Sequence, residues 1–123
     1  MAIFSFDQFA EWLEEAVERI PPRYCQNLTG GFNLQEESRQ EGDFWILGEY
    51  IEDEQLGCFI MFYYGSFVEL LKDEPEEVWK EEILDTVLHE MQHHLELMAG
   101  RDDLGRREME ELAQALRDSG RKG

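Results

Sequence analysis

The sequence predicts an α+β domain with one small sheet, and three features support this class. Apolar residues recur at helical spacing near the N-terminus and again in a long segment over residues 73–99. Between these segments lie short aromatic and β-branched runs that are typical of strands. At 123 residues, of which 42% are hydrophobic, the chain has enough apolar material for one core. We therefore expect a single domain over residues 1–123.

The first helix is expected to begin after Ser5, which together with Gln8 has the form of a capping box. Apolar residues then follow at helical spacing until Pro21 and Pro22 stop the pattern. They predict one buried face, which consists of Phe6, Phe9, Leu13, Ala16, Val17 and Ile20.

Three segments are expected to form strands. They are "GFNLQ" (31–35), "FWILGEYI" (44–51) and "CFIMFYYG" (58–65). The acidic, glycine-containing link between the last two suits a hairpin. The run over 58–65 is apolar on both faces, so we expect it to lie inside the sheet or beneath a helix.

The long helix is expected to begin near Asp73, with Pro75 and several acids in its first turn, and to end at Gly100. A C-terminal helix should follow over residues 106–117, since apolar residues recur there at helical spacing. Residues 118–123 are expected to be a frayed tail. The order helix, strands, helix, helix is what predicts the α+β class.

The formal net charge of −18 bears on the expected partners and location. Such an acidic chain repels nucleic acid and anionic membranes, so neither is expected as a partner. No apolar run approaches the length that crosses a bilayer, and the N-terminal segment lacks the features of a secretory signal. We expect a cytoplasmic protein in which Cys25 and Cys58 stay reduced.

The three histidines of the chain fall within the segment "LHEMQHH", Leu88 to His94. His89 and His93 are four residues apart on the predicted long helix, so both imidazoles can reach one zinc ion. The intervening Glu90 completes an H-E-x-x-H motif and is the expected general base for a metal-bound water. His94 points away from the pair by about 140°, so we expect it to pack or to hydrogen-bond instead. Asp85 is placed to accept a hydrogen bond from the second ring nitrogen of His89.

The segment "TVLHEMQHH" resembles the active-site segment of the minimal zincin-like metallopeptidases, small bacterial zinc peptidases with a His-Glu-x-x-His-His motif. The helix "FDQFAEWLEEAVERIPP" and the strand "FIMFYYGSF" occur in an order similar to theirs, so the resemblance covers most of the chain. It implies a small mixed β-sheet over a helix that carries two zinc ligands, His89 and His93, and the catalytic Glu90.

The sequence departs from the family's pattern at the position where the third zinc ligand is expected. Members of the family commonly have a glycine three residues after the second histidine and an acidic ligand three residues later, but Glu96 and Ala99 stand there in this chain. Gly100 and Asp103 recreate the turn and the acid about one helical turn later. Asp103 is therefore the preferred ligand. The alternatives, which stay open, are Asp102, Glu108, Glu110, Glu111 and Cys58.

These features predict a zinc metallopeptidase, with one Zn²⁺ per chain, that hydrolyses peptide or amide bonds in a peptide or small protein substrate. An extended substrate could pair with the strand "FIMFYYG", with Tyr63 or Tyr64 donating to the oxyanion. One alternative is a zinc-stabilised binding module without an open coordination position. Another is a metal-free acidic interaction domain.

Overall fold

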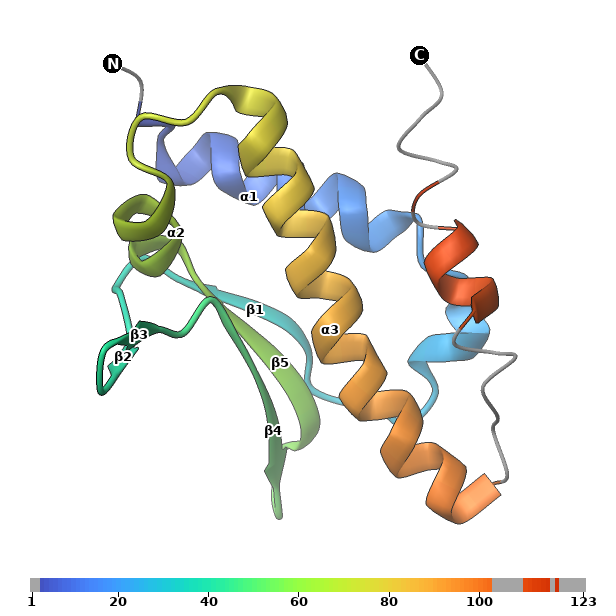
Figure 1. Cartoon of the computed structure of the whole chain (residues 1–123). Helices are drawn as coiled ribbons and strands as arrows, with labels where there is room; N and C mark the ends of the chain where they lie inside the picture. Colours follow the sequence, from blue (N-terminus) through green and yellow to red (C-terminus); the bar gives the residue numbers. More distant parts are fainter. Residues whose placement is uncertain (1–2, 103–109, 116, 118–123) are drawn as a thin grey trace.

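The computed structural model describes residues 3–102, 110–115 and 117, and Figure 1 shows its architecture. The elements are α1 (Phe6–Glu18), the 3₁₀ helix η1 (Pro22–Cys25), β1 (Gly31–Gln35), β2 (Gln40–Glu41), β3 (Phe44–Trp45), β4 (Gly48–Asp53), β5 (Gly57–Tyr63), α2 (Tyr64–Leu71) and α3 (Glu76–Asp102). Residues 110–115 and 117 are also helical. The remainder of the predicted C-terminal helix and the tail at 118–123 lie outside the described residues. The predicted α+β class with a small mixed sheet is confirmed.

The main sheet has the strand order β1-β5-β4. β1 runs parallel to β5, with Gly31 opposite Phe59, and β4 runs antiparallel to β5, with Tyr50 opposite Ile60. The predicted hairpin between the last two strands is confirmed. Because β5 is paired on both sides, it has no free edge for an extended peptide, and the expectation that this strand receives one is wrong. β4 is an edge strand of this sheet and contacts α3.

Ser5 caps the first helix, as predicted, whereas the side chain of Gln8 donates to Glu11 Oε1 at 3.3 Å. The Ser5 side chain accepts a hydrogen bond from the backbone N–H of Gln8 at 3.1 Å. Phe9, Leu13 and Ala16 on the predicted face are buried. This helix contacts α3, which also contacts β4.

Three of the predicted boundaries are wrong. The strand expected over 58–65 ends at Tyr63, and the chain turns directly into α2, whose Phe67 and Leu71 are buried one turn apart. The strand expected over 44–51 is divided, because Phe44–Trp45 pairs with Gln40–Glu41 in a separate two-stranded ladder. α3 does not end at Gly100 but continues to Asp102. A glycine inside a helix costs only about 1 kcal/mol, which tertiary context readily overrides.

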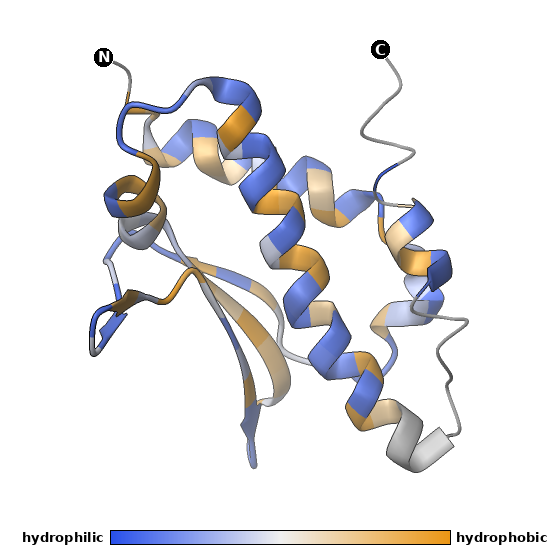
Figure 2. Ribbon diagram, in the orientation of Figure 1, coloured by the Kyte–Doolittle hydropathy of each residue, from blue (hydrophilic) through white to orange (hydrophobic). Residues whose placement is uncertain are grey.

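The hydrophobic core lies between the sheet and the helices α1, α2 and α3. Figure 2 shows apolar residues along β5 and α2, whereas α3 alternates between apolar and polar residues. Val87, Met91, Leu95 and Met98 of α3 are buried. In the described part of the chain, we find no helix with the length and apolar character needed to cross a bilayer.

Candidate metal and catalytic site

The H-E-x-x-H segment lies in the middle of α3, as predicted. His89 and His93 are exposed, and their ring centroids are 4.8 Å apart with the ring planes at 86°. Glu90, by contrast, is only 6% exposed. The helix therefore presents two neighbouring imidazoles to solvent and places a shielded carboxyl group beside them.

A cavity of about 660 Å³ lies over these residues. One wall is α3, which contributes His89, Glu90, His93, Glu96 and Leu97. The opposite wall consists of β4 and the segment that leads into it, with Arg39, Glu41, Ile46, Gly48, Glu49, Tyr50 and Glu52. Five carboxylates and one guanidinium line this space, so its electrostatic field favours a cation such as a divalent metal.

A second cavity, of about 420 Å³, adjoins the first along α3. The two share Ile46, Gly48, His89 and Glu90 as lining residues. The Glu90 side chain thus borders open space in both directions along the helix. An extended chain has room on either side of the candidate catalytic group.

Burial raises the pKa of the Glu90 carboxyl above its ordinary value. His89 and His93 lower this pKa by favouring the charged form, Glu49 raises it, and the backbone N–H of Tyr50, which donates to the carboxyl, lowers it. The net direction is upward because desolvation is the largest of these effects. A carboxyl whose pKa lies closer to neutrality is better suited to take up and return a proton.

Gly48 allows β4 to approach α3 closely. A Cβ atom at this position would lie 2.9 Å from Cγ2 of Thr86 and 3.3 Å from Cγ of Glu90. The first distance is shorter than real Cβ contacts, so one of the two elements would have to shift. Glycine at residue 48 therefore sets the separation between the sheet edge and the candidate general base.

Replacing Gly48 by alanine should destabilise the protein by about 1–3 kcal/mol, since the added methyl group overpacks the contact between β4 and α3. Urea denaturation measures this change. Gly31→Ala is a useful comparison, because a Cβ atom at residue 31 would meet nothing within 4 Å. Any loss of stability in this variant would come only from the backbone φ of 68°. A Gly48→Ala protein as stable as the wild type would contradict the packing described here.

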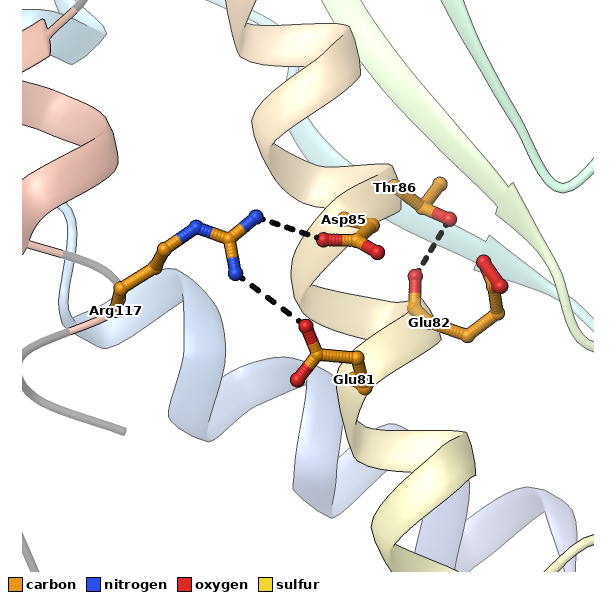
Figure 3. Close-up of polar contacts among 5 residues, drawn as sticks. All are labelled: Glu81, Glu82, Asp85, Thr86 and Arg117. Atoms are coloured by element: carbon orange, nitrogen blue, oxygen red, sulfur yellow. Dashed lines mark hydrogen bonds and ion pairs between the residues drawn. The ribbon is translucent and has the colours of Figure 1, made fainter. Parts of the chain in front are cut away.

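Asp85 does not occupy the position that its spacing from His89 suggested. Figure 3 shows its carboxylate facing Arg117, whose Nη2 lies 3.1 Å from Asp85 Oδ1 and whose Nη1 lies 3.3 Å from Glu81 Oε2. Both carboxylates and the guanidinium are partly exposed, so the two ion pairs contribute little stability. They place the Arg117 side chain beside the first half of α3.

The candidates for a third metal ligand fall into two groups. Asp103 and Glu108 lie outside the described residues. Glu111 is engaged elsewhere, because its Oε1 accepts the Tyr24 hydroxyl at 3.0 Å and pairs with Arg23. Glu110 is exposed. Within the described ranges, no group of three or more His, Cys, Asp or Glu side chains is arranged to hold a metal, so neither Glu110, Glu111 nor Cys58 completes a site with the histidine pair.

The course of α3 also bears on the two aspartates at its end. Asp102 is the last residue of α3. At 1.5 Å per helical residue, its Cα lies about 13 Å along the axis from that of His93. Asp103 stays a prediction, but the turn at Gly100 on which it relied is absent.

Several residues that the sequence did not single out also line the cavity, and three of them are polar residues near the sheet edge. These three are Arg39, Glu49 and Tyr50. Nε of Arg39 lies 3.4 Å from Oε1 of Glu49, and the same oxygen accepts the Tyr63 hydroxyl at 2.7 Å. No local spacing links these positions to the H-E-x-x-H motif, because they reach it only through the pairing of the strands.

The two tyrosines that were expected to donate to an oxyanion have other partners. Tyr63 donates to Glu49, and burial together with this bond raises its pKa to about 12. The Tyr64 hydroxyl donates to the backbone carbonyl of Phe4. Tyr50 is the tyrosine that lines the cavity.

Comparisons with known proteins found one matching family model and similar solved structures. Residues 32–115 match the sequence model of the zincin-like metallopeptidases. A solved structure, described as a conserved hypothetical protein from Thermus thermophilus, is 34% identical to this chain with a TM-score of 0.70, and the match covers 80% of this chain and 100% of that one. No curated protein matches the chain. The family match includes the H-E-x-x-H helix and β4, and the chain belongs to the zincin-like metallopeptidase family.

Proposed function

We propose that this protein is a zinc-dependent peptidase that hydrolyses peptide or amide bonds. The observation that carries the proposal is the arrangement on α3, where the His89 and His93 rings lie 4.8 Å apart at the rim of a cavity that the buried Glu90 also lines. Family membership supports the same reaction class.

The residues present fit a zinc ion, since His89 and His93 offer two imidazole nitrogens one helical turn apart. In this proposal both residues would be ligands, and Asp103, which lies outside the described residues, stays the predicted third. When bound, zinc would acidify its coordinated water and polarise the carbonyl of the substrate. A site with an open position for that water is what separates a catalytic zinc centre from a structural one.

Glu90 would act as the general base. Its carboxyl borders both cavities, and its raised pKa suits it to accept a proton from the attacking water and to return that proton to the leaving amine. The backbone N–H of Tyr50 and the close approach of Gly48 fix the position of this side chain. The side chain is only 6% exposed, and this desolvation is the main cause of its raised pKa.

The substrate would bind as an extended chain along β4. This strand is the sheet edge beside α3, and Gly48, Tyr50 and Glu52 line the cavity between them. Main-chain hydrogen bonds to a sheet edge hold a peptide without demanding one particular sequence. Short peptides are the preferred substrates of this proposal.

A peptide-library digest tests the proposal. We expect the zinc-loaded wild type to cleave a subset of peptides, as read by mass spectrometry, and we expect a chelator to stop the cleavage until zinc is added back. His93→Ala, purified in parallel, should not cleave them. Cleavage that persists in chelator and in His93→Ala would mean that a contaminating peptidase is responsible.

A further inference from the structure

Arg39 carries the one guanidinium group among the described residues that line the cavity over the H-E-x-x-H motif. Five carboxyl groups share this lining, and they belong to Glu41, Glu49, Glu52, Glu90 and Glu96. A carboxylate that enters the cavity is repelled by these acids, except where the guanidinium is close enough to outweigh them. Arg39 is therefore the side chain of this lining that is suited to hold a negatively charged part of a substrate.

The backbone of Arg39 is fixed to α2. Its N–H donates to Oγ of Ser66 at 2.9 Å, and the Ser66 hydroxyl donates to the Arg39 carbonyl at 3.1 Å. The same carbonyl accepts the N–H of Ile46 at 2.8 Å. Ser66 has no exposed surface, and a Cβ atom added at Gly65 would lie only 2.5 Å from the backbone nitrogen of Ser38. The segment before Arg39 thus packs tightly on α2, and its side chain reaches the cavity from a fixed backbone position.

The guanidinium of Arg39 has a loosely bound partner on β4. Its Nε lies 3.4 Å from Oε1 of Glu49, whereas strong bonds between charged groups are about 2.7–2.9 Å long. That oxygen also accepts the Tyr63 hydroxyl at 2.7 Å. Within the described ranges, Nη1 and Nη2 of Arg39 form no ion pair, and the Arg39 side chain is 49% exposed. Adjacent N–H groups of a guanidinium are the ones that bind a carboxylate in a paired arrangement.

The strand that carries Glu49 is held against α3 by the residue that follows it. The hydroxyl oxygen of Tyr50 lies 2.7 Å from Nδ1 of the buried His94. The prediction that His94 hydrogen-bonds is confirmed. Glu49 is also close enough to Glu90 to raise the pKa of its carboxyl. Arg39 is thus linked through Glu49 to the part of the cavity where the candidate general base lies.

We propose that Arg39 is a specificity-determining residue whose guanidinium binds a carboxylate of the peptide substrate. This inference rests on the proposed function, because it names the substrate class of the same cavity. The carboxylate belongs either to the C-terminus of a short peptide or to an Asp or Glu side chain near the scissile bond. In the first case the enzyme cleaves close to the C-terminal end, and in the second it cleaves close to an acidic residue.

A titration with three peptides tests the contact without catalysis. The peptides are acetyl-trialanine, its C-terminal amide, and acetyl-Ala-Asp-Ala amide. The full-length nitrogen-15-labelled protein is treated with a chelator, so that no metal ion competes for the carboxylate. We expect one carboxylate peptide to shift the NMR signal of the Arg39 Nε–H and to bind roughly 10-fold more tightly than the neutral amide, as one charge-assisted contact allows.

Two variants assign this preference to the Arg39 side chain. Arg39→Gln should bind the carboxylate peptides and the neutral amide equally. Arg23→Gln is the matched control, because Arg23 also lies 3.4 Å from a glutamate, Glu111, but is not among the residues that line the cavity. It should retain the preference of the wild type.

The same contact has a kinetic readout in the zinc-loaded enzyme. For a peptide that the wild type cleaves, either amidation of the C-terminus or an Asp→Asn change in the peptide should lower kcat/KM roughly 10-fold. The change that causes the loss identifies the source of the carboxylate. Arg39→Gln should cleave the charged and neutral peptides at the same rate. Arg39→Lys should retain part of the preference, because an ammonium keeps the charge but not the paired bonds.

The outcomes separate this inference from the proposed function. A wild type that cleaves no peptide overturns the proposed function and the substrate role with it, while the titration still decides whether Arg39 binds a carboxylate. An active wild type that cleaves charged and neutral peptides equally overturns the inference alone. A carboxylate preference that persists in Arg39→Gln also overturns it, and so does a titration in which neither carboxylate peptide binds more tightly than the amide.

Discussion

Replacing Glu90 by glutamine is expected to lower kcat for peptide hydrolysis by about 10²- to 10⁴-fold, the range that general acid–base catalysis contributes. The glutamine side chain keeps the size of glutamate and can still accept the backbone N–H of Tyr50 through its carbonyl oxygen. It cannot take up a proton at neutral pH. The fold should be retained, because the substitution also removes a carboxyl whose charged form is disfavoured by burial.

Single-turnover kinetics on a peptide identified with the wild type would measure this loss. Glu77→Gln is a matched control, since Glu77 is an exposed glutamate in the first turn of the same helix and lies outside both cavities. Circular dichroism and metal content should be unchanged in both variants. A Glu90→Gln protein that retains wild-type kcat would remove Glu90 from the mechanism.

Replacing Trp79 by alanine is expected to cost about 3–5 kcal/mol of unfolding free energy, as large-to-small changes of a buried tryptophan do. Trp79 has no exposed surface, and its Nε1–H donates to the carbonyl of Leu71 at 3.1 Å. Its ring lies 5.6 Å from that of Phe4 and 6.5 Å from that of Phe67. The residue thus fixes the beginning of α3 against α2 and the N-terminal segment.

Equilibrium unfolding in urea tests this prediction, with Trp45→Ala as the comparison. Trp45 is only half-buried, in the short strand β3, so its loss should cost clearly less. The candidate site lies on α3, so only the folded protein should bind the metal. Under conditions in which Trp79→Ala is partly unfolded, its apparent metal affinity should therefore be lower than that of the wild type. Equal destabilisation by the two substitutions would contradict the assignment of Trp79 to the core.

Features that lie within one helix could be predicted from the sequence alone. The Ser5 cap and the pairing of His89 with His93 depend only on helical geometry, which places residues three and four apart on one face. Both are visible in the sequence because no distant part of the chain is needed to form them. The direction of His94, away from the histidine pair, follows from the same helical geometry.

The features that the sequence did not predict are those that depend on tertiary pairing. Tyr50 reaches His94 across 44 positions of the chain, and only the order β1-β5-β4 makes its strand the one beside α3. The same order removes the free edge from β5. The segment of α2 is short and contains aromatic residues, so its sequence fits a strand pattern as well as a helical one. In the structure it is a helix whose Phe67 and Leu71, four residues apart, are both buried.

The measurement that tests this account most directly is the metal content of the protein purified without a histidine tag or added metal, by elemental mass spectrometry. We expect about one zinc per chain in the wild type, as in a mononuclear catalytic site, and its loss in His93→Ala. Glu90→Gln should retain the metal, since Glu90 is proposed as a base and not as a ligand. A wild type that holds no metal even after zinc is offered would contradict the account and leave His89 and His93 as an exposed face of an acidic interaction domain.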